Sequence, residues 1–67
     1  MEKKRLWLKD IRKKLSLTQM EISEKLGISR SHYAGIENGI KNPSMELAEN
    51  LSDYMGFDLN KFKRNIL

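Results

Sequence analysis

The chain has 67 residues, no cysteine and a formal net charge of +4, from 13 lysines and arginines against nine acidic residues. A chain of this length builds one domain with a modest core, and without cysteine it has neither a disulfide nor a thiolate metal site. No apolar run approaches the roughly 20 residues that span a bilayer, and none follows the basic N-terminus as in a secretory signal. The sequence therefore predicts a single cytoplasmic domain over residues 1–67.

The charges are distributed unevenly along the chain. Residues 1–14 carry a net charge of +5, residues 15–43 are balanced, residues 44–59 carry −4 and residues 60–67 carry +3. This separation suits a domain that turns one face toward a polyanion and another away from it. It equally suits an ordinary solvated surface, so charge alone leaves both interpretations open.

The first predicted helix covers residues 2–15. Leu8, Ile11 and Leu15 recur there at i, i+3 and i+7, which places them on one stripe of a helix, while lysines and arginines cover the rest. Trp7 has two interpretations, because it either covers the core beside Ile11 or lies exposed for a partner. The spacing predicts an amphipathic helix whose apolar side faces the core.

A capping box, the letters TQME, opens the second predicted helix. The Thr18 hydroxyl is expected to accept a hydrogen bond from the backbone amide of Glu21, whose carboxylate accepts one from the amide of Thr18. Ile22 and Leu26 form the buried stripe of this helix. Gly27 then suits the left-handed position that commonly ends a helix.

The third predicted helix follows almost at once. Ser29 is its expected N-cap, Tyr33 and Ile36 face inward, and Gly39 ends it. Residues 27–28 alone separate it from the second helix. So short a connection forces a sharp bend, which is typical of a helix-turn-helix rather than of two parallel helices.

Two further helices complete the prediction. Ser44 caps the fourth helix, Gly56 stops it, and Asp58 caps a short fifth helix. The apolar stripes are Met45, Ala48, Leu51 and Met55 in the fourth helix, and Leu59, Phe62 and Ile66 in the fifth. No stretch alternates apolar and polar residues as a strand does, so the predicted fold class is all-α with five helices. The stripe of the fifth helix either forms a dimer interface or closes the core.

Residues 17–44, LTQMEISEKLGISRSHYAGIENGIKNPS, resemble the helix-turn-helix of the Cro/repressor-type regulators, the XRE family. The resemblance is carried by the LTQ opening, the LGIS turn, the IENG exit and the NPS entry to the next helix, and it extends from about Leu6 to Leu59. It implies a compact five-helix, lambda-repressor-like bundle. In that fold residues 29–38 form the recognition helix, which lies in the major groove of duplex DNA.

The resemblance also implies roles for individual side chains. The implied base-contacting residues are Arg30, Ser31 and Gly35. The implied phosphate-contacting residues are Thr18, Gln19, Ser29, His32, Asn38, Lys41 and Asn42. Arg12 and Glu37 match a structural ion pair. Elementary chemistry agrees, because the guanidinium fork of Arg30 fits O6 and N7 of guanine and the free amides of a helix N-terminus hold a phosphate.

Two residues depart from the family's pattern. Gly35 stands where a base-reading side chain is common, after an equally small Ala34, and Ile40 stands where a basic residue is frequent. Gly35 either allows the helix to approach the groove closely or marks a contact that has been given up. Arg30 is the only strong base of the third helix, so specificity is expected to combine few direct contacts with DNA shape.

The sequence contains no catalytic constellation, glycine-rich phosphate loop or set of metal ligands around the single His32. We therefore expect no enzyme, cofactor, metal, membrane or small-molecule substrate. The predicted function is a transcriptional regulator, a repressor of prophage or mobile-element type, that binds double-stranded DNA as a homodimer. The alternative is a protein-binding module of the same fold, such as an antirepressor, an antitoxin or an assembly subunit, with weak or no DNA binding.

Overall fold

Four α-helices and a final 3-10 helical turn form the described part of this computed structural model, residues 4–62. They are α1 (Leu6–Lys14), α2 (Gln19–Leu26), α3 (Arg30–Glu37), α4 (Met45–Met55) and η1 (Leu59–Phe62). Residues 4–62 contain no strand, so the predicted all-α class is confirmed. The prediction of a fifth α-helix is corrected, because a short 3-10 turn stands in its place.

Side-chain caps start three of the helices where the sequence predicts them. The capping box is complete, since Thr18 Oγ1 accepts from the Glu21 amide at 3.0 Å and Glu21 Oε1 accepts from the Thr18 amide at 2.8 Å. Ser29 and Ser44 accept from the backbone amides three residues later at 3.0 and 3.1 Å. These bonds satisfy amides that have no partner inside their helices.

Left-handed residues end two helices and shape one link that the sequence did not reveal. Gly27 and Gly56 close α2 and α4 with φ of 71° and 76°, as predicted. Ser16, between α1 and α2, also has a positive φ of 59°. Leu17 holds this link, because its amide donates to the Arg12 carbonyl at 3.1 Å and its carbonyl accepts from Arg12 Nη1 at 3.0 Å.

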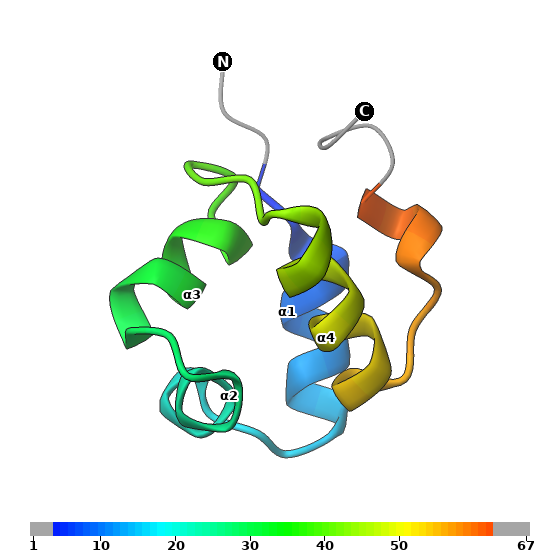
Figure 1. The fold of residues 1–67 in the computed structure, drawn as a ribbon. Coiled ribbons are helices and arrows are strands. Elements are labelled where there is room, and N and C mark those ends of the chain that lie inside the picture. Colours follow the sequence, from blue (N-terminus) through cyan, green and yellow to red (C-terminus); the bar gives the residue numbers. More distant parts are fainter. Residues whose placement is uncertain (1–3, 63–67) are drawn as a thin grey trace.

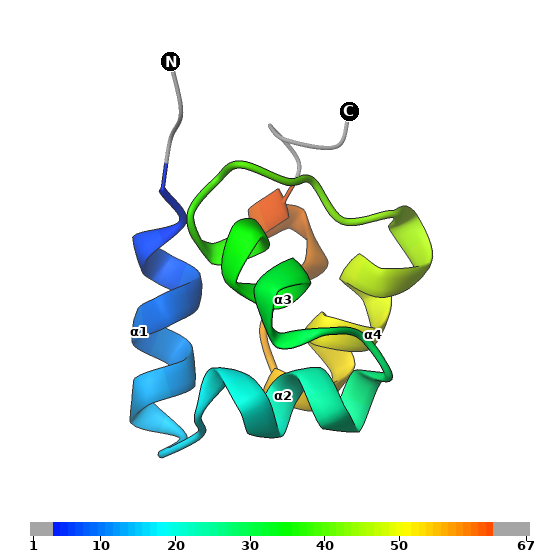
Figure 2. The ribbon, with the colours of Figure 1, turned by 90° about the vertical axis from the view of Figure 1, so that its left-hand side faces the viewer.

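The helices are arranged so that α3 lies at one side of the molecule (Figure 1). When that side faces the viewer, α1 and α4 stand on either side of α3, and α2 crosses below it (Figure 2). The bend at Gly27 sets α3 against α2. No helix within residues 4–62 has the length and apolar character needed to cross a membrane.

One apolar core lies among these elements and η1. Its buried members are Leu8, Ile22, Tyr33, Ile36, Ala48, Leu51, Met55 and Phe62. Two residues of the predicted apolar stripes lie on the surface: Leu15 is 46% exposed at the end of α1, and Met45 is 47% exposed at the start of α4. At these two helix ends periodicity alone overstates burial, although Met55 at the other end of α4 is buried as predicted.

The last predicted stripe divides between the core and the surface. Phe62 is wholly buried, which favours closing of the core over a dimer interface for this residue. Trp7 is half-buried and meets Phe57 and Phe62 edge-to-face at centroid distances of 5.2 and 5.1 Å, so it covers the core. Leu59 remains half-exposed, and Ile66 lies outside the described residues.

Candidate nucleic-acid interface

The outer face of α3 begins with the polar cluster that the sequence singled out. Arg30 and Ser31 are both exposed, while Tyr33 and Ile36 on the opposite face are fully buried. Ser29 Oγ caps the helix and lies 3.3 Å from Ser31 Oγ. The core therefore fixes α3 by its inner face and leaves Arg30 and Ser31 on the surface.

A buried ion pair anchors the far end of α3 to α1. Arg12 Nε lies 2.6 Å from Glu37 Oε2, and Tyr33 Oη donates to the same oxygen at 2.7 Å. Burial alone raises the pKa of the Glu37 carboxyl, but hydrogen bonds from Arg12, Tyr33 and Gln19 outweigh it and hold that pKa below its ordinary value. Burial and the bond to Glu37 also raise the pKa of Tyr33. The expected pairing of Arg12 with Glu37 is present.

Gln19 connects this ion pair to Arg30. Its Nε2 donates to Glu37 Oε1 at 3.2 Å, and its Oε1 accepts from Arg30 Nη1 at 3.1 Å. Glu37 only accepts and Arg30 only donates, so the amide of Gln19 has a single suitable orientation. The side chain of Gln19 is thus engaged within the protein, and its backbone amide at the start of α2 lies outside the hydrogen-bond ladder of that helix.

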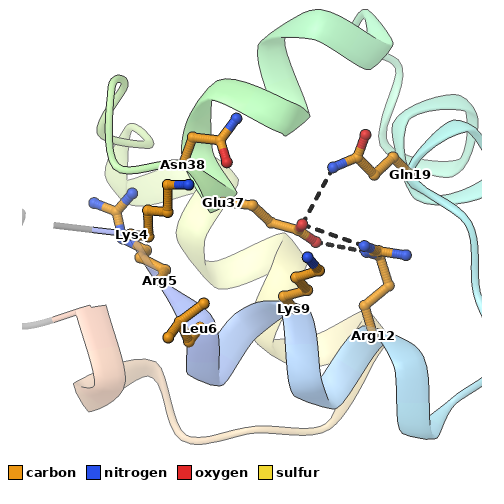
Figure 3. Close-up of a pocket in the computed structure, with 8 residues that line it drawn as sticks. All are labelled: Lys4, Arg5, Leu6, Lys9, Arg12, Gln19, Glu37 and Asn38. Atoms are coloured by element: carbon orange, nitrogen blue, oxygen red, sulfur yellow. Dashed lines mark hydrogen bonds and ion pairs between the residues drawn. The ribbon is translucent and has the colours of Figure 1, made fainter. Parts of the chain in front are cut away.

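A basic hollow of about 340 Å³ lies beside this network (Figure 3). Its walls come from the residues before α1, from α1 itself, from the start of α2 and from the end of α3. They consist of Lys4, Arg5, Leu6, Lys9, Arg12, Gln19, Glu37 and Asn38. In Figure 3 Lys9 extends from α1 toward Glu37. Four cations face one carboxylate that is already paired, so the hollow attracts anions.

Arg5 is a buried residue at the edge of this hollow that sequence reasoning missed. It is 2% exposed, and its backbone amide donates to the Glu37 carbonyl at 2.7 Å. Its Nη1 donates to the carbonyls of Ile36 and Lys41, the latter at 3.0 Å, and its Nη2 donates to Asn42 Oδ1 at 2.7 Å. Burial lowers the pKa of this guanidinium. Arg5 thereby ties the start of the chain to the loop after α3.

No local pattern in the sequence marks Arg5 for this role. The partners of its side chain lie 31 to 37 residues further along the chain, and no spacing rule links such distant positions. The consequence for Asn42 is specific. Because a guanidinium has no acceptor, the carbonyl of the Asn42 amide faces Arg5, and the NH₂ group is left to donate elsewhere.

The remaining residues expected to contact phosphate are spread along this side of the fold. Thr18, Ser29, Asn38, Lys41 and Asn42 are exposed, whereas His32 is half-buried. His32 lines a second hollow, between α3 and α4, with Ser44 and Leu47 among its neighbours. Within residues 4–62 no group of three histidines, cysteines or carboxylates is placed to hold a metal ion.

Gly35, one of the residues expected to contact a base, lies under the side chain of Lys41. It is buried, because the Lys41 side chain lies across it, and a Cβ atom placed on Gly35 would be 3.2 Å from both Cγ and Cδ of Lys41. Gly35 therefore presents no surface of its own on the outer face of α3. The glycine gives room to a lysine stem, which was not among the alternatives that the sequence suggested.

Comparison with known proteins agrees with this geometry. Residues 8–62 match the family model described as helix-turn-helix. YqaF of Bacillus subtilis, an HTH-type transcriptional regulator, is 34% identical over 62 residues, which make up 92% of this chain and 82% of that protein. The immunity repressor protein of Bacillus phage phi105 is 38% identical over 53 residues, or 79% of this chain and 37% of that protein. The chain belongs to the Cro/repressor-type (XRE) helix-turn-helix family of DNA-binding transcription regulators.

Proposed function

We propose that the chain is a sequence-specific repressor, of prophage or mobile-element type, that places α3 in the major groove of duplex DNA. The observation that carries the proposal is the exposed start of α3, where Arg30 and Ser31 face outward beside a basic hollow. The guanidinium of Arg30 fits the O6 and N7 acceptors of guanine. The likeness to a phage immunity repressor supports the repressor assignment.

Phosphate contacts set the position of α3 in this proposal. At the N-termini of α2 and α3, Thr18 and Ser29 cap the amides three residues later, and the amides between cap and capped residue stay free for a phosphate oxygen to accept from. Gln19 contributes through its backbone amide, and His32, Asn38 and Asn42 contribute donors from α3 and the loop after it. The cations of the hollow add attraction that does not depend on sequence.

A homodimer on a two-fold operator completes the proposal. One α3 reads only a few base pairs, so useful affinity requires two copies on half-sites about 34 Å apart. Phe62 belongs to the core, which leaves Leu59 as the described member of the last apolar stripe with surface to share. Because the target is DNA, we place the protein in the cytoplasm.

Salt-dependent binding to duplex DNA tests the proposal. Affinity for random duplex is expected to fall steeply as salt rises from about 50 to 200 mM, because phosphate contacts release counterions. Selection from a random DNA pool is expected to yield a two-fold symmetric consensus. Absence of binding at low salt would overturn the proposal and favour the protein-binding module instead.

A further inference from the structure

Lys41 occupies the surface of α3 that Gly35 leaves vacant. The Cβ, Cγ and Cδ atoms of Lys41 lie 3.6, 3.2 and 3.2 Å from the position of a Cβ on Gly35. A Cβ atom at residue 35 would be closer to the stem than in ordinary packing, so the stem would have to move by a few tenths of an ångström. The lysine stem therefore lies directly on the helix rather than extending away from it.

The face that Lys41 crosses is the one that begins with Ser31. Residues four apart lie on the same face of a helix, so Gly35 follows Ser31 one turn later, and Asn38 follows Gly35. Ser31 and Asn38 are exposed on either side of it. The stem of Lys41, as far as Cδ, therefore lies on the outer face of α3.

The backbone of Lys41 is held as firmly as its stem. Its amide donates to the Gly35 carbonyl at 3.1 Å, and its carbonyl accepts from Arg5 Nη1 at 3.0 Å. Among residues 4–62 the one ion pair joins Arg12 to Glu37. No carboxylate in this part of the chain therefore pairs with the Lys41 ammonium. A cation held in place without a partner suits recognition of a fixed acceptor.

We propose that Lys41 reads a base, and that its side chain takes the third reading position of α3, where Gly35 has no side chain. This inference rests on the proposed function. A lysine donates to O6 and N7 of guanine as an arginine does, so a second guanine preference is expected beside that of Arg30.

The test compares base preferences of matched variants after selection from a random DNA pool. Lys41→Met keeps an apolar stem over Gly35 and removes the charge, and it is expected to lower discrimination about fivefold or more at one base pair. Arg30→Ala is expected to lower discrimination at a different base pair. Lys25→Met, which removes the same charge from the end of α2, serves as the control and is expected to leave the preferences unchanged.

A double-mutant comparison tests the role of Gly35. Gly35→Ala is expected to weaken the preference at the base pair assigned to Lys41, because the new methyl group pushes the lysine stem outward by a few tenths of an ångström. In a Lys41→Ala background the same change is expected to leave that preference as it is. An equal effect of Gly35→Ala in both backgrounds would overturn the coupling.

The outcomes separate this inference from the proposed function. If Lys41→Met weakens binding equally on all sequences and lowers the salt slope by about one unit, Lys41 contacts a phosphate and the inference is wrong. If Lys41→Met changes neither affinity nor preference, the inference is wrong as well. If the unaltered chain does not bind duplex DNA at low salt, the proposed function itself fails.

Discussion

Gln19 accepts a hydrogen bond from Arg30 at 3.1 Å, so the first residue of α2 holds the side chain that we propose reads a base. The other end of the same amide donates to the buried Glu37. The position of Arg30 thus depends on an ion pair at the far end of its own helix. A guanidinium held in this way loses less conformational entropy when it meets a base.

Gln19→Ala tests this support. The change removes the acceptor that orients Arg30, so affinity for the preferred site is expected to fall more than affinity for random duplex. Stability is expected to fall by only about 1 kcal/mol, the usual value of a hydrogen bond. Fluorescence anisotropy on both DNA duplexes and urea unfolding measure these effects. Equal loss of affinity on the two duplexes would show that the Gln19 side chain does not support base reading by Arg30.

Arg30→Ala tests the reading residue itself. Loss of a guanidinium that pairs with guanine is expected to cost about 1–3 kcal/mol of binding and to relax the preference at one base pair. Arg30→Lys keeps the charge but not the planar fork, so it is expected to recover general affinity without full discrimination. Selection from a random pool measures both. A preference that survives Arg30→Ala would contradict the assignment.

The depressed pKa of Glu37 makes stability depend on pH in a defined direction. Its folded pKa lies below the unfolded value of about 4.3, so the ionised form stabilises the fold above that pH, and the contribution is lost as pH falls through the folded pKa. Glu37→Gln is expected to lower stability near neutral pH by about 3 kcal/mol, because it leaves Arg12 buried without a counter-charge.

Urea unfolding as a function of pH measures this effect. The Glu37→Gln protein is expected to show a smaller loss of stability below about pH 4.3 than the unaltered chain. Asp53→Asn, at an exposed carboxylate of α4, is the control. If both variants have the same acid dependence as the unaltered chain, the buried pair does not carry the pH response.

The capping box of α2 makes a second stability prediction. Thr18→Ala removes the oxygen that accepts from the Glu21 amide, so unfolding free energy is expected to fall by about 1 kcal/mol. For a domain of this size that lowers Tm by about 4–8 °C. Thr18→Ser keeps the hydroxyl and is expected to retain most of the stability. An unchanged Tm for Thr18→Ala would refute the cap.

Ser16 offers a change that should stabilise the protein. Its φ of 59° is in the left-handed region, which costs a residue with a Cβ about 1–2 kcal/mol. Ser16→Gly removes that cost but adds freedom to the unfolded chain, so a net gain of about 0.5–1 kcal/mol is expected by chemical denaturation. Ser16→Ala keeps the Cβ, and no gain is expected. A loss of stability in Ser16→Gly would show that the serine hydroxyl matters more than the backbone.

Features encoded by neighbouring residues were predictable from the sequence. Thr18, Ser29 and Ser44 each cap a helix through an amide three residues away, so a short window of sequence contains both partners. Gly27 and Gly56 likewise end helices through their own backbone freedom. The landmarks of the family then fixed the order of the helices and the exposed start of α3.

Features that depend on distant residues were not predictable in this way. Arg5 is buried because carbonyls of a loop more than 30 residues away meet its guanidinium, and Lys41 covers Gly35 because that loop folds back on α3. Helical periodicity describes one element at a time. Periodicity therefore placed Phe62 on an apolar stripe, but it could not show that the ring is buried in the core of the same chain.

Arg5 and Phe62 stand near opposite ends of the described chain, yet the guanidinium lies 5.5 Å from the centre of the ring. During synthesis on the ribosome the first of these residues emerges early and the second emerges late. The nascent polypeptide cannot enclose the arginine until almost all of the described residues have been translated. The loop contacts alone therefore do not complete the surroundings of Arg5, because a chain that stops before Phe62 contains every hydrogen-bond partner of the guanidinium but lacks the ring that covers it.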